Sequence, residues 1–542
     1  MTIIASPIPT ASGPVSGIRA EPGAAAVTVF KGIPYAAAPT GHLRWRPPQP
    51  PETWDEVRLA HEFGPICPQT DRLSQTDRLS TLPHTLPMHE DCLTLNVWTA
   101  AEAAETEEPR PVLVWIHGGR FVGGSGADPL YDGAALAAAG LVVVTFNYRT
   151  GVFGFLAAPE LSAESGHACS GNYGLLDQIA ALRWVQVNIA AFGGDPDRVT
   201  IAGQSAGAAC VQDLVYSPLA KGLFHRAIAQ SGALHPRDPA LAHLAGSYRT
   251  LDVAEQQGAR YLKEHGAASI EELRALPVSS LLEGNDADDS SAADDPSDAN
   301  PAAHHPPLFR PVLDGHVFPR TYHEALSLGP ANDVPIITGT NKDENGASPK
   351  PQITLADYAT IARATYGPAA DEFLALYPAS TDAEAAEQVN ESARDKSRVS
   401  TYLWSTLWAK TAKSPVFTYF WTHPAPGPDA AEEGAFHGSE INYVFNNLYA
   451  TDRPWTDVDR RIADRLSRFI VNFAATGDPN APGLPVWPAA DPAAADDADA
   501  TDPANPAVPQ TMQLGGILGS MPVATDLRLA FHRRHIESQP AR

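Results

Sequence analysis

The residues with the clearest chemistry are Gly203-Gln-Ser205-Ala-Gly207, where a serine stands between two glycines. Val199–Ile201 predicts the end of a strand, and Ala206–Val215 predicts the start of a helix. The strand-to-helix turn is so sharp that side chains larger than glycine would collide there, and it lifts the serine above the sheet. The N–H of Ala206 and the positive end of the helix can then stabilise an oxyanion. The pattern predicts that Ser205 is a nucleophile.

The five-residue pattern by itself also fits a glycine-rich turn with an exposed serine. It should arise by chance in roughly one chain in ten of this size. The strand before it and the helix after it are the structural context that a nucleophilic serine requires. They favour the catalytic interpretation.

A second glycine-rich segment lies upstream of the serine. Val112–Ile116 is a short apolar run, typical of a buried strand, and it ends in His117-Gly118-Gly119-Arg120-Phe121. Glycines let the backbone approach a substrate and point N–H groups at it, so this loop is interpreted as the second part of an oxyanion hole. The alternative is a glycine-rich loop without a ligand. We expect His117 to brace the loop and not to act as a base.

These motifs and several others resemble one family. Ser205 with the preceding Phe192-Gly-Gly run is similar to the serine signature of the type-B carboxylesterases, the cholinesterase and para-nitrobenzyl esterase superfamily. The resemblance runs from Val15 to Trp487 and implies an α/β-hydrolase fold, in which helices flank a large, mostly parallel sheet with long loop insertions. It also implies hydrolysis of carboxylic esters. Further matching segments are Phe30–Ala36, Arg44–Pro48, Glu90–Trp98, Gln230–Gly232 and Pro311–Gly315.

The same resemblance directs the search for the catalytic acid. In this fold the chain order is serine, acid, histidine, and the acid follows a strand. Val334–Thr338 predicts that strand, and Asp343-Glu344 follows it. The family uses the glutamate, which implies Glu344, and Asp343 is the alternative. Asn345 stands where the family commonly has glycine, so the local turn is left open.

The catalytic base is expected after a later strand, predicted at Val416–Trp421. His437-Gly-Ser-Glu440 resembles the family's His-Gly-x-Glu loop, which implies that His437 is the base. Ser205 would then attack an ester carbonyl, His437 would carry the proton to the leaving alcohol, and Glu344 would orient the ring. Other histidines, His423, His316 and His323, are interpreted as core or surface residues.

The resemblance also suggests residues around the substrate. The N–H groups of Gly119, Arg120 and Ala206 are expected to face the oxyanion, and Gly118 shapes the same loop. Relatives often carry glycine or alanine at the position of Arg120, so its side chain is expected to narrow the gorge or to meet an acidic substrate. The candidate pocket residues, whose aromatic members fit the core equally well, are Phe121, Gln204, Phe309, Trp404, Trp408 and Phe445.

Gln204 stands where cholinesterases carry a glutamate, so a cationic alcohol loses one attraction. Neutral, moderately bulky esters are therefore expected, and choline esters are disfavoured. Aryl carbamates and phthalate-type diesters are the alternative substrates. A non-catalytic binding homologue is a further alternative, which the intact set of serine, acid and histidine disfavours.

The chain has 542 residues, enough for several domains, but the residues of one site are drawn from His117 to His437. We therefore expect a single domain over residues 1–542. Residues 285–305 and 489–507 are acidic, low-complexity stretches and are interpreted as solvated, mobile loops. The formal net charge of −25 disfavours nucleic acid and anionic membranes as partners.

The chain has four cysteines. Cys67 and Cys92 match the family's N-terminal disulfide, and that pairing is implied by the resemblance alone. Cys169 and Cys210 have no such match and are expected to be free. No metal-binding or cofactor motif is present, so neither a metal nor a cofactor is expected.

The N-terminal segment, Met1–Pro14, lacks the charged and apolar regions of a signal peptide. The longest apolar run, Ala134–Phe146, is too short to span a bilayer. We therefore expect a cytoplasmic protein whose partner is a small-molecule ester, with a monomer favoured.

Overall fold

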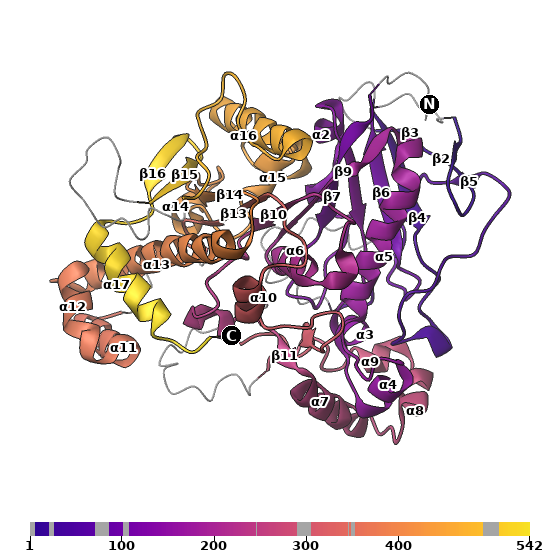
Figure 1. The fold of residues 1–542 in the computed structure, drawn as a ribbon, viewed down its shortest axis with the longest axis horizontal. Coiled ribbons are helices and arrows are strands. Elements are labelled where there is room, and N and C mark those ends of the chain that lie inside the picture. Colours follow the sequence, from indigo (N-terminus) through magenta and orange to yellow (C-terminus); the bar gives the residue numbers. More distant parts are fainter. Residues whose placement is uncertain are drawn as a thin grey trace.

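A mostly parallel sheet forms the centre of the molecule, as the resemblance implied (Figure 1). The computed structural model describes residues 6–20, 27–70, 86–100, 108–244, 246–289, 305–344, 346–347, 353–491 and 509–541. The sheet has 11 strands, parallel from β8 to β15 and antiparallel at both edges. In spatial order they are β16 (Gly519–Pro522), β15 (Gln510–Leu514), β14 (Val416–Trp421), β13 (Ile336–Asn341), β10 (Arg226–Gln230), β9 (Gly194–Gln204), β7 (Arg110–Ile116), β8 (Val142–Phe146), β6 (Thr94–Thr99), β4 (Thr28–Pro34) and β3 (Ile18–Arg19).

Helices cover both faces of this sheet (Figure 1). Two minor sheets pair β1 (Ile8–Pro9), β2 (Pro14–Ser16) and β5 (Arg58–Leu59), and β11 (Arg249–Thr250) with β12 (Val312–Leu313). The α-helices are α2 (Ala134–Ala138), α3 (Gly151–Phe155), α4 (Pro159–Glu164), α5 (Tyr173–Asn188), α6 (Ala206–Tyr216), α7 (Leu251–Glu264), α8 (Ile270–Ala275), α9 (Val278–Leu281), α10 (Tyr322–Leu328), α11 (Leu355–Tyr366), α12 (Ala370–Leu376), α13 (Asp382–Thr411), α14 (Ala430–Glu433), α15 (Ile441–Val444), α16 (Asp457–Thr476) and α17 (Asp526–Glu537).

Strand β7 shows how the sheet separates two cores. Val112, Val114 and Ile116 pack into the core on the side of α5 and α6. Leu113 and Trp115, which alternate with them, pack into the opposite core beneath α16. Side chains of a strand alternate between its faces, so a strand with helices on both sides is mostly apolar on both faces. This is why the continuous apolar runs in the sequence correspond to central strands.

The predicted elements that frame the site are all present. The strand predicted at Val416–Trp421 is β14, and the helix predicted after Ser205 is α6. The strand predicted at Val334–Thr338 is β13, which begins and ends later, at Ile336 and Asn341. None of the described helices combines the length and the hydropathy that a bilayer crossing requires.

The start of the acidic stretch 285–305 differs from its prediction as a mobile loop. Asn285 and Asp289 are buried, with exposed fractions of 0% and 3%. Asp289 pairs with Arg310 at 2.8 Å, and the N–H of Asp289 donates to Pro306 O. Buried charge requires a partner, so these residues form the packed base of the segment. Residues 290–304, like 492–507 of the second acidic stretch, lie outside the described residues.

Candidate active site

Ser205 lies on the sharp turn between β9 and α6. Its φ of 60° and ψ of −125° are unusual for a residue with a side chain. The turn is held by a hydrogen bond of 2.9 Å from Ser205 N–H to Gln230 O on β10. A Cβ on Gly203 would lie 2.5 Å from Gly207 O, and one on Gly207 would lie 2.2 Å from Ile116 O. Both glycines are therefore required by close packing, as the sequence predicted.

The glycine-rich loop after β7 packs directly on this turn. A Cβ on Gly118 would lie 2.7 Å from Gln204 O and 3.4 Å from the Cβ of Ser205. Gly119 and Arg120 have positive φ angles of 107° and 55°. Within the described residues, neither of their N–H groups donates to another backbone oxygen. The loop therefore packs against the turn of Ser205 through Gly118, and Ala206 is the first residue of α6.

His117 braces this loop. Its ring is buried and stacks on Tyr148 with centroids 4.4 Å apart. His117 Nδ1 lies 2.9 Å from Gly118 O, and the hydroxyl of Tyr148 donates to His117 O. Burial lowers the pKa of His117 to about 4 despite the bond to Gly118, so the ring is neutral near pH 7.

Glu344 and His437 form a direct pair. Glu344 Oε2 lies 2.5 Å from His437 Nδ1. Burial alone would raise the pKa of Glu344, but the adjacent His437 and its hydrogen bonds hold the pKa below its ordinary value. The side chain of His437 is 41% exposed, so substrate can reach the ring. Asp343, the alternative acid, instead pairs with Arg394 at 2.6 Å.

The second nitrogen of His437 lies next to the strand-to-helix turn that carries Ser205. His437 Nε2 lies 3.1 Å from Gln204 Nε2, and Gln204 immediately precedes Ser205. Because Nδ1 donates to Glu344, Nε2 is the nitrogen that accepts a proton. Gln204 was predicted to line the substrate pocket, and the structure places its amide against the ring of His437.

Two residues that support Glu344 had no role assigned from the sequence. The hydroxyl of Ser231 and the N–H of Asn341 each donate to Glu344 Oε1, both at 2.8 Å. Ser231 follows β10 and belongs to the Gln230-Ser-Gly motif, which was the available signal. Asn341 ends β13, and its side chain donates to Phe436 O and to Glu440 Oε2. It thereby links the acid loop to the histidine loop.

The parallel strands explain how these distant segments meet. Gln204, Gln230 and Gly339 are neighbours in register on β9, β10 and β13, and Asn341 faces Trp421 at the end of β14. Ser205, Ser231, Glu344 and His437 all follow the carboxyl ends of these four strands. This is the edge where open α/β sheets place their sites.

The aromatic residues predicted to line the pocket lie in the core, the other role that their residue types allowed. Their exposed fractions are 0% or 1%, which leaves no surface for an open pocket. Trp404 and Trp408 stack on each other, and Phe445 packs against Trp115 in the core under α16. Large rings next to apolar strands bury more area in the core than at a rim. Of the remaining two, Phe121 packs against Phe155, and Phe309 packs against Tyr261.

The side chain of Arg120 has protein partners. Its Nη2 donates to Asp288 Oδ1 at 2.9 Å and to His305 O at 3.0 Å. The side chain was expected to narrow the gorge or to meet an acidic substrate, and in the structure its charge is paired with that of Asp288. Arg120 therefore ties the loop after β7 to residues of the 285–305 segment.

All four cysteines are free thiols in this structure, so the disulfide implied by the resemblance is not formed here. Cys67 and Cys92 are nevertheless neighbours and are both buried. Their mutual hydrogen bond, together with burial, raises the pKa of Cys92. Cys169 and Cys210, which were expected to be free, are also buried. In the described part of the chain, no group of three or more His, Cys, Asp or Glu residues is arranged to hold a metal ion.

The helix behind Ser205 carries a buried acid that gives a prediction for stability. Burial raises the pKa of Asp213 to about 8, although the hydroxyl of Tyr322 donates to it. The folded state therefore holds this proton more tightly than the unfolded state, whose pKa is about 3.9. The free energy of unfolding of the wild type should therefore fall as pH rises from about 4 to 8. Asp213→Asn lacks this group, so the wild type should lose at least about 1 kcal/mol relative to that variant over this range. Urea unfolding of both proteins at pH 5 and pH 9 measures this, and parallel pH profiles would contradict it.

The sheet, the elbow and the helices on both faces define the class of protein, an α/β-hydrolase. The chain belongs to the carboxylesterase family, whose model matches residues 5–510. Members of this family are serine hydrolases of carboxylic esters, and this protein is an ester hydrolase.

Several relatives are similar over most of their length. The chain is 37% identical over 490 residues to the fumonisin B1 esterase of Sphingopyxis macrogoltabida, covering 88% of this chain and 83% of that one. It is 36% identical over 474 residues to the para-nitrobenzyl esterase of Bacillus subtilis, covering 85% and 88%. Among solved structures, a thermophilic para-nitrobenzyl esterase aligns with a TM-score of 0.74 and 30% identity, covering 98% of this chain and 99% of that one.

Proposed function

We propose that the protein hydrolyses neutral, moderately bulky esters through a Ser205–His437–Glu344 triad and an acyl-enzyme intermediate. The observation that carries the proposal is the His437 ring, bonded to Glu344 through Nδ1 and facing the elbow through Nε2. A base must be oriented by a third group and must reach the nucleophile. The bond to Glu344 supports the first requirement, and the contact of Nε2 with Gln204, the residue before Ser205, supports the second.

The reaction follows from this arrangement. Ser205 Oγ attacks the ester carbonyl while His437 Nε2 takes its proton, and the carbonyl oxygen becomes an anion. The N–H groups of Gly119, Arg120 and Ala206 stabilise that anion. His437 then protonates the leaving alcohol, and a water molecule repeats the sequence to release the acid. Glu344 remains ionised and stabilises the imidazolium, which agrees with its lowered pKa.

The charges around the site support a neutral ester. Gln204 is uncharged where cholinesterases carry a glutamate, so the site lacks that attraction for a cationic alcohol. Arg120 is paired with Asp288, so its charge is compensated before an anionic substrate arrives. Aryl carbamates and phthalate-type diesters are the second candidates, because the same triad and donors would serve them. The names of the relatives range from fumonisin B1 to para-nitrobenzyl esters and do not single out one ester.

The test combines covalent labelling with a substrate panel. A fluorophosphonate probe should modify Ser205, located by mass spectrometry of the digested protein. The panel compares kcat/KM for para-nitrophenyl acetate, butyrate and octanoate, butyrylcholine, an aryl carbamate and a dialkyl phthalate. The neutral esters should rank first. Labelling at another residue would overturn the triad, and a higher kcat/KM for the carbamate or the phthalate would replace the substrate class.

A further inference from the structure

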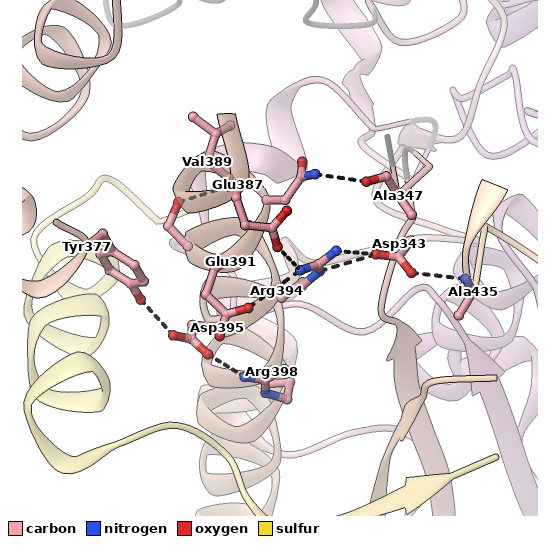
Figure 2. A network of polar contacts seen from close by, with 12 residues as sticks. Asp343, Ala347, Tyr377, Glu387, Val389, Glu391, Arg394, Asp395, Arg398 and Ala435 are labelled. Carbon is pink, nitrogen blue, oxygen red and sulfur yellow. Dashed lines mark hydrogen bonds and ion pairs between the residues drawn. The ribbon is translucent and has the colours of Figure 1, made fainter. Parts of the chain in front are cut away.

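Asp343 precedes Glu344, and its carboxylate points toward Arg394 on helix α13 (Figure 2). Arg394 on α13 donates to Asp343 Oδ1 through both Nε, at 3.2 Å, and Nη2, at 2.6 Å. Asp343 is 5% exposed and Arg394 is 9% exposed. A buried, two-point pairing of guanidinium and carboxylate fixes direction as well as distance.

The same carboxylate also holds the loop of the histidine. Asp343 Oδ2 accepts from the N–H of Ala435 at 3.0 Å, and the N–H of Asp343 donates to Ala435 O at 3.1 Å. A Cβ on Gly434, whose φ is 61°, would lie 2.3 Å from Asp343 Oδ2, so the loop comes close because this residue is glycine. Glu344 and His437 thus each lie within two residues of the paired hydrogen bonds between Asp343 and Ala435.

Helix α13 holds Arg394 and, through it, Asp343 in place. Arg394 also contacts Glu387 at 3.0 Å and Glu391 at 3.5 Å on its own helix, which restrict the guanidinium (Figure 2). Two more contacts join α13 to the acid loop and its strand, from Asn390 Nδ2 to Ala347 O and from Ser397 Oγ to Thr340 Oγ1. The helix has 30 residues and packs against α17 and β14, so it is anchored along its length.

We propose that Asp343 and Arg394 form a positioning clamp that sets the hydrogen bond between Glu344 and His437. This inference rests on the proposed function, because it assumes that the Glu344–His437 pair serves catalysis. Without Arg394, the carboxylate of Asp343 would be buried and unpaired beside Glu344, and the loop would shift to hydrate it. Glu344 and His437 would then both move. Glu344 follows Asp343 in the chain, and His437 lies two residues after Ala435, which is hydrogen-bonded to Asp343.

The experiment compares Arg394→Met with a matched control, Arg44→Met. Arg44 makes a similarly buried two-point pair with Glu90, with both contacts at 2.6 Å. Among the described residues, neither partner has a hydrogen bond or ion pair to Ser205, Glu344 or His437. A displacement of about 1 Å can cost about 100-fold in rate, so we expect kcat of Arg394→Met to fall about 10- to 100-fold. KM should change by less than about twofold, because ester binding is not altered. The control should lose thermal stability while its kcat stays within about twofold of the wild type.

Two further variants keep the test decisive if Arg394→Met folds poorly. Arg394→Lys restores one charged contact and should recover part of kcat. The double variant Asp343→Asn with Arg394→Met removes the unpaired charge and should fold, yet its kcat should stay at least about 10-fold low because the clamp is absent. In parallel, the far-downfield NMR signal of the His437 Nδ1 proton should weaken in Arg394→Met and persist in Arg44→Met.

The inference is overturned if Arg394→Met keeps the kcat of the control, or if the double variant regains the wild-type rate. Failure of the proposed function gives a different result, because the wild type itself would then escape labelling at Ser205 or lack turnover of esters.

Discussion

Replacement of Ser205 by alanine should abolish the hydrolysis of para-nitrophenyl butyrate while the fold is kept. In the proposed mechanism the hydroxyl is the attacking group, and without it only the proposed oxyanion donors and substrate binding would remain. In triad hydrolases such a loss lowers kcat on the order of 10⁴-fold or more. Steady-state kinetics with circular dichroism and a melting curve test the prediction.

The structure explains why the fold should survive this change. Ser205 is held at its φ of 60° by the backbone bond to Gln230 O, which alanine can also make. The flanking glycines, which make the close contacts, stay in place. A variant that retained a tenth of the activity would point to a different nucleophile.

Replacement of Glu344 by glutamine should lower kcat on the order of 10³- to 10⁴-fold, close to the effect of removing a triad acid elsewhere. Glutamine keeps the size of the side chain but loses the charge that, in the proposed mechanism, stabilises the imidazolium. It also presents an N–H that opposes the N–H of His437 Nδ1, which favours the wrong tautomer. The measurement is the pre-steady-state rate of acylation, which follows the proton transfer directly.

The matched control for this variant is the neighbouring carboxylate. Asp343→Asn keeps an oxygen for Arg394 but loses the acceptor for Ala435 N–H. It should therefore slow the reaction by no more than about 100-fold, through displacement of the pair and not through loss of charge at His437. If Asp343→Asn proved the more damaging change, the acid role would pass to Asp343.

The sequence by itself predicted the local backbone geometry around Ser205. A turn as sharp as the one at Ser205 requires glycine at fixed positions, so its pattern is visible in five residues. Central strands such as that at Val112–Ile116 were also predictable, because a strand covered by helices on both faces is mostly an apolar run. The resemblance to the carboxylesterases supplied the fold and the loop of His437.

The tertiary structure decided the choices that depend on distant contacts. Asp343 and Glu344 are adjacent carboxylates, and only the fold shows which one faces His437, 93 residues further along the chain. The partner of Asp343 is Arg394, 51 residues away on α13, and no local pattern connects the two. Burial is likewise a property of the packed molecule, which is why Trp404 and Phe445 lie in the core and not in a pocket. Side-chain type limits what a residue can do, but its role is set by neighbours that only the folded chain brings together.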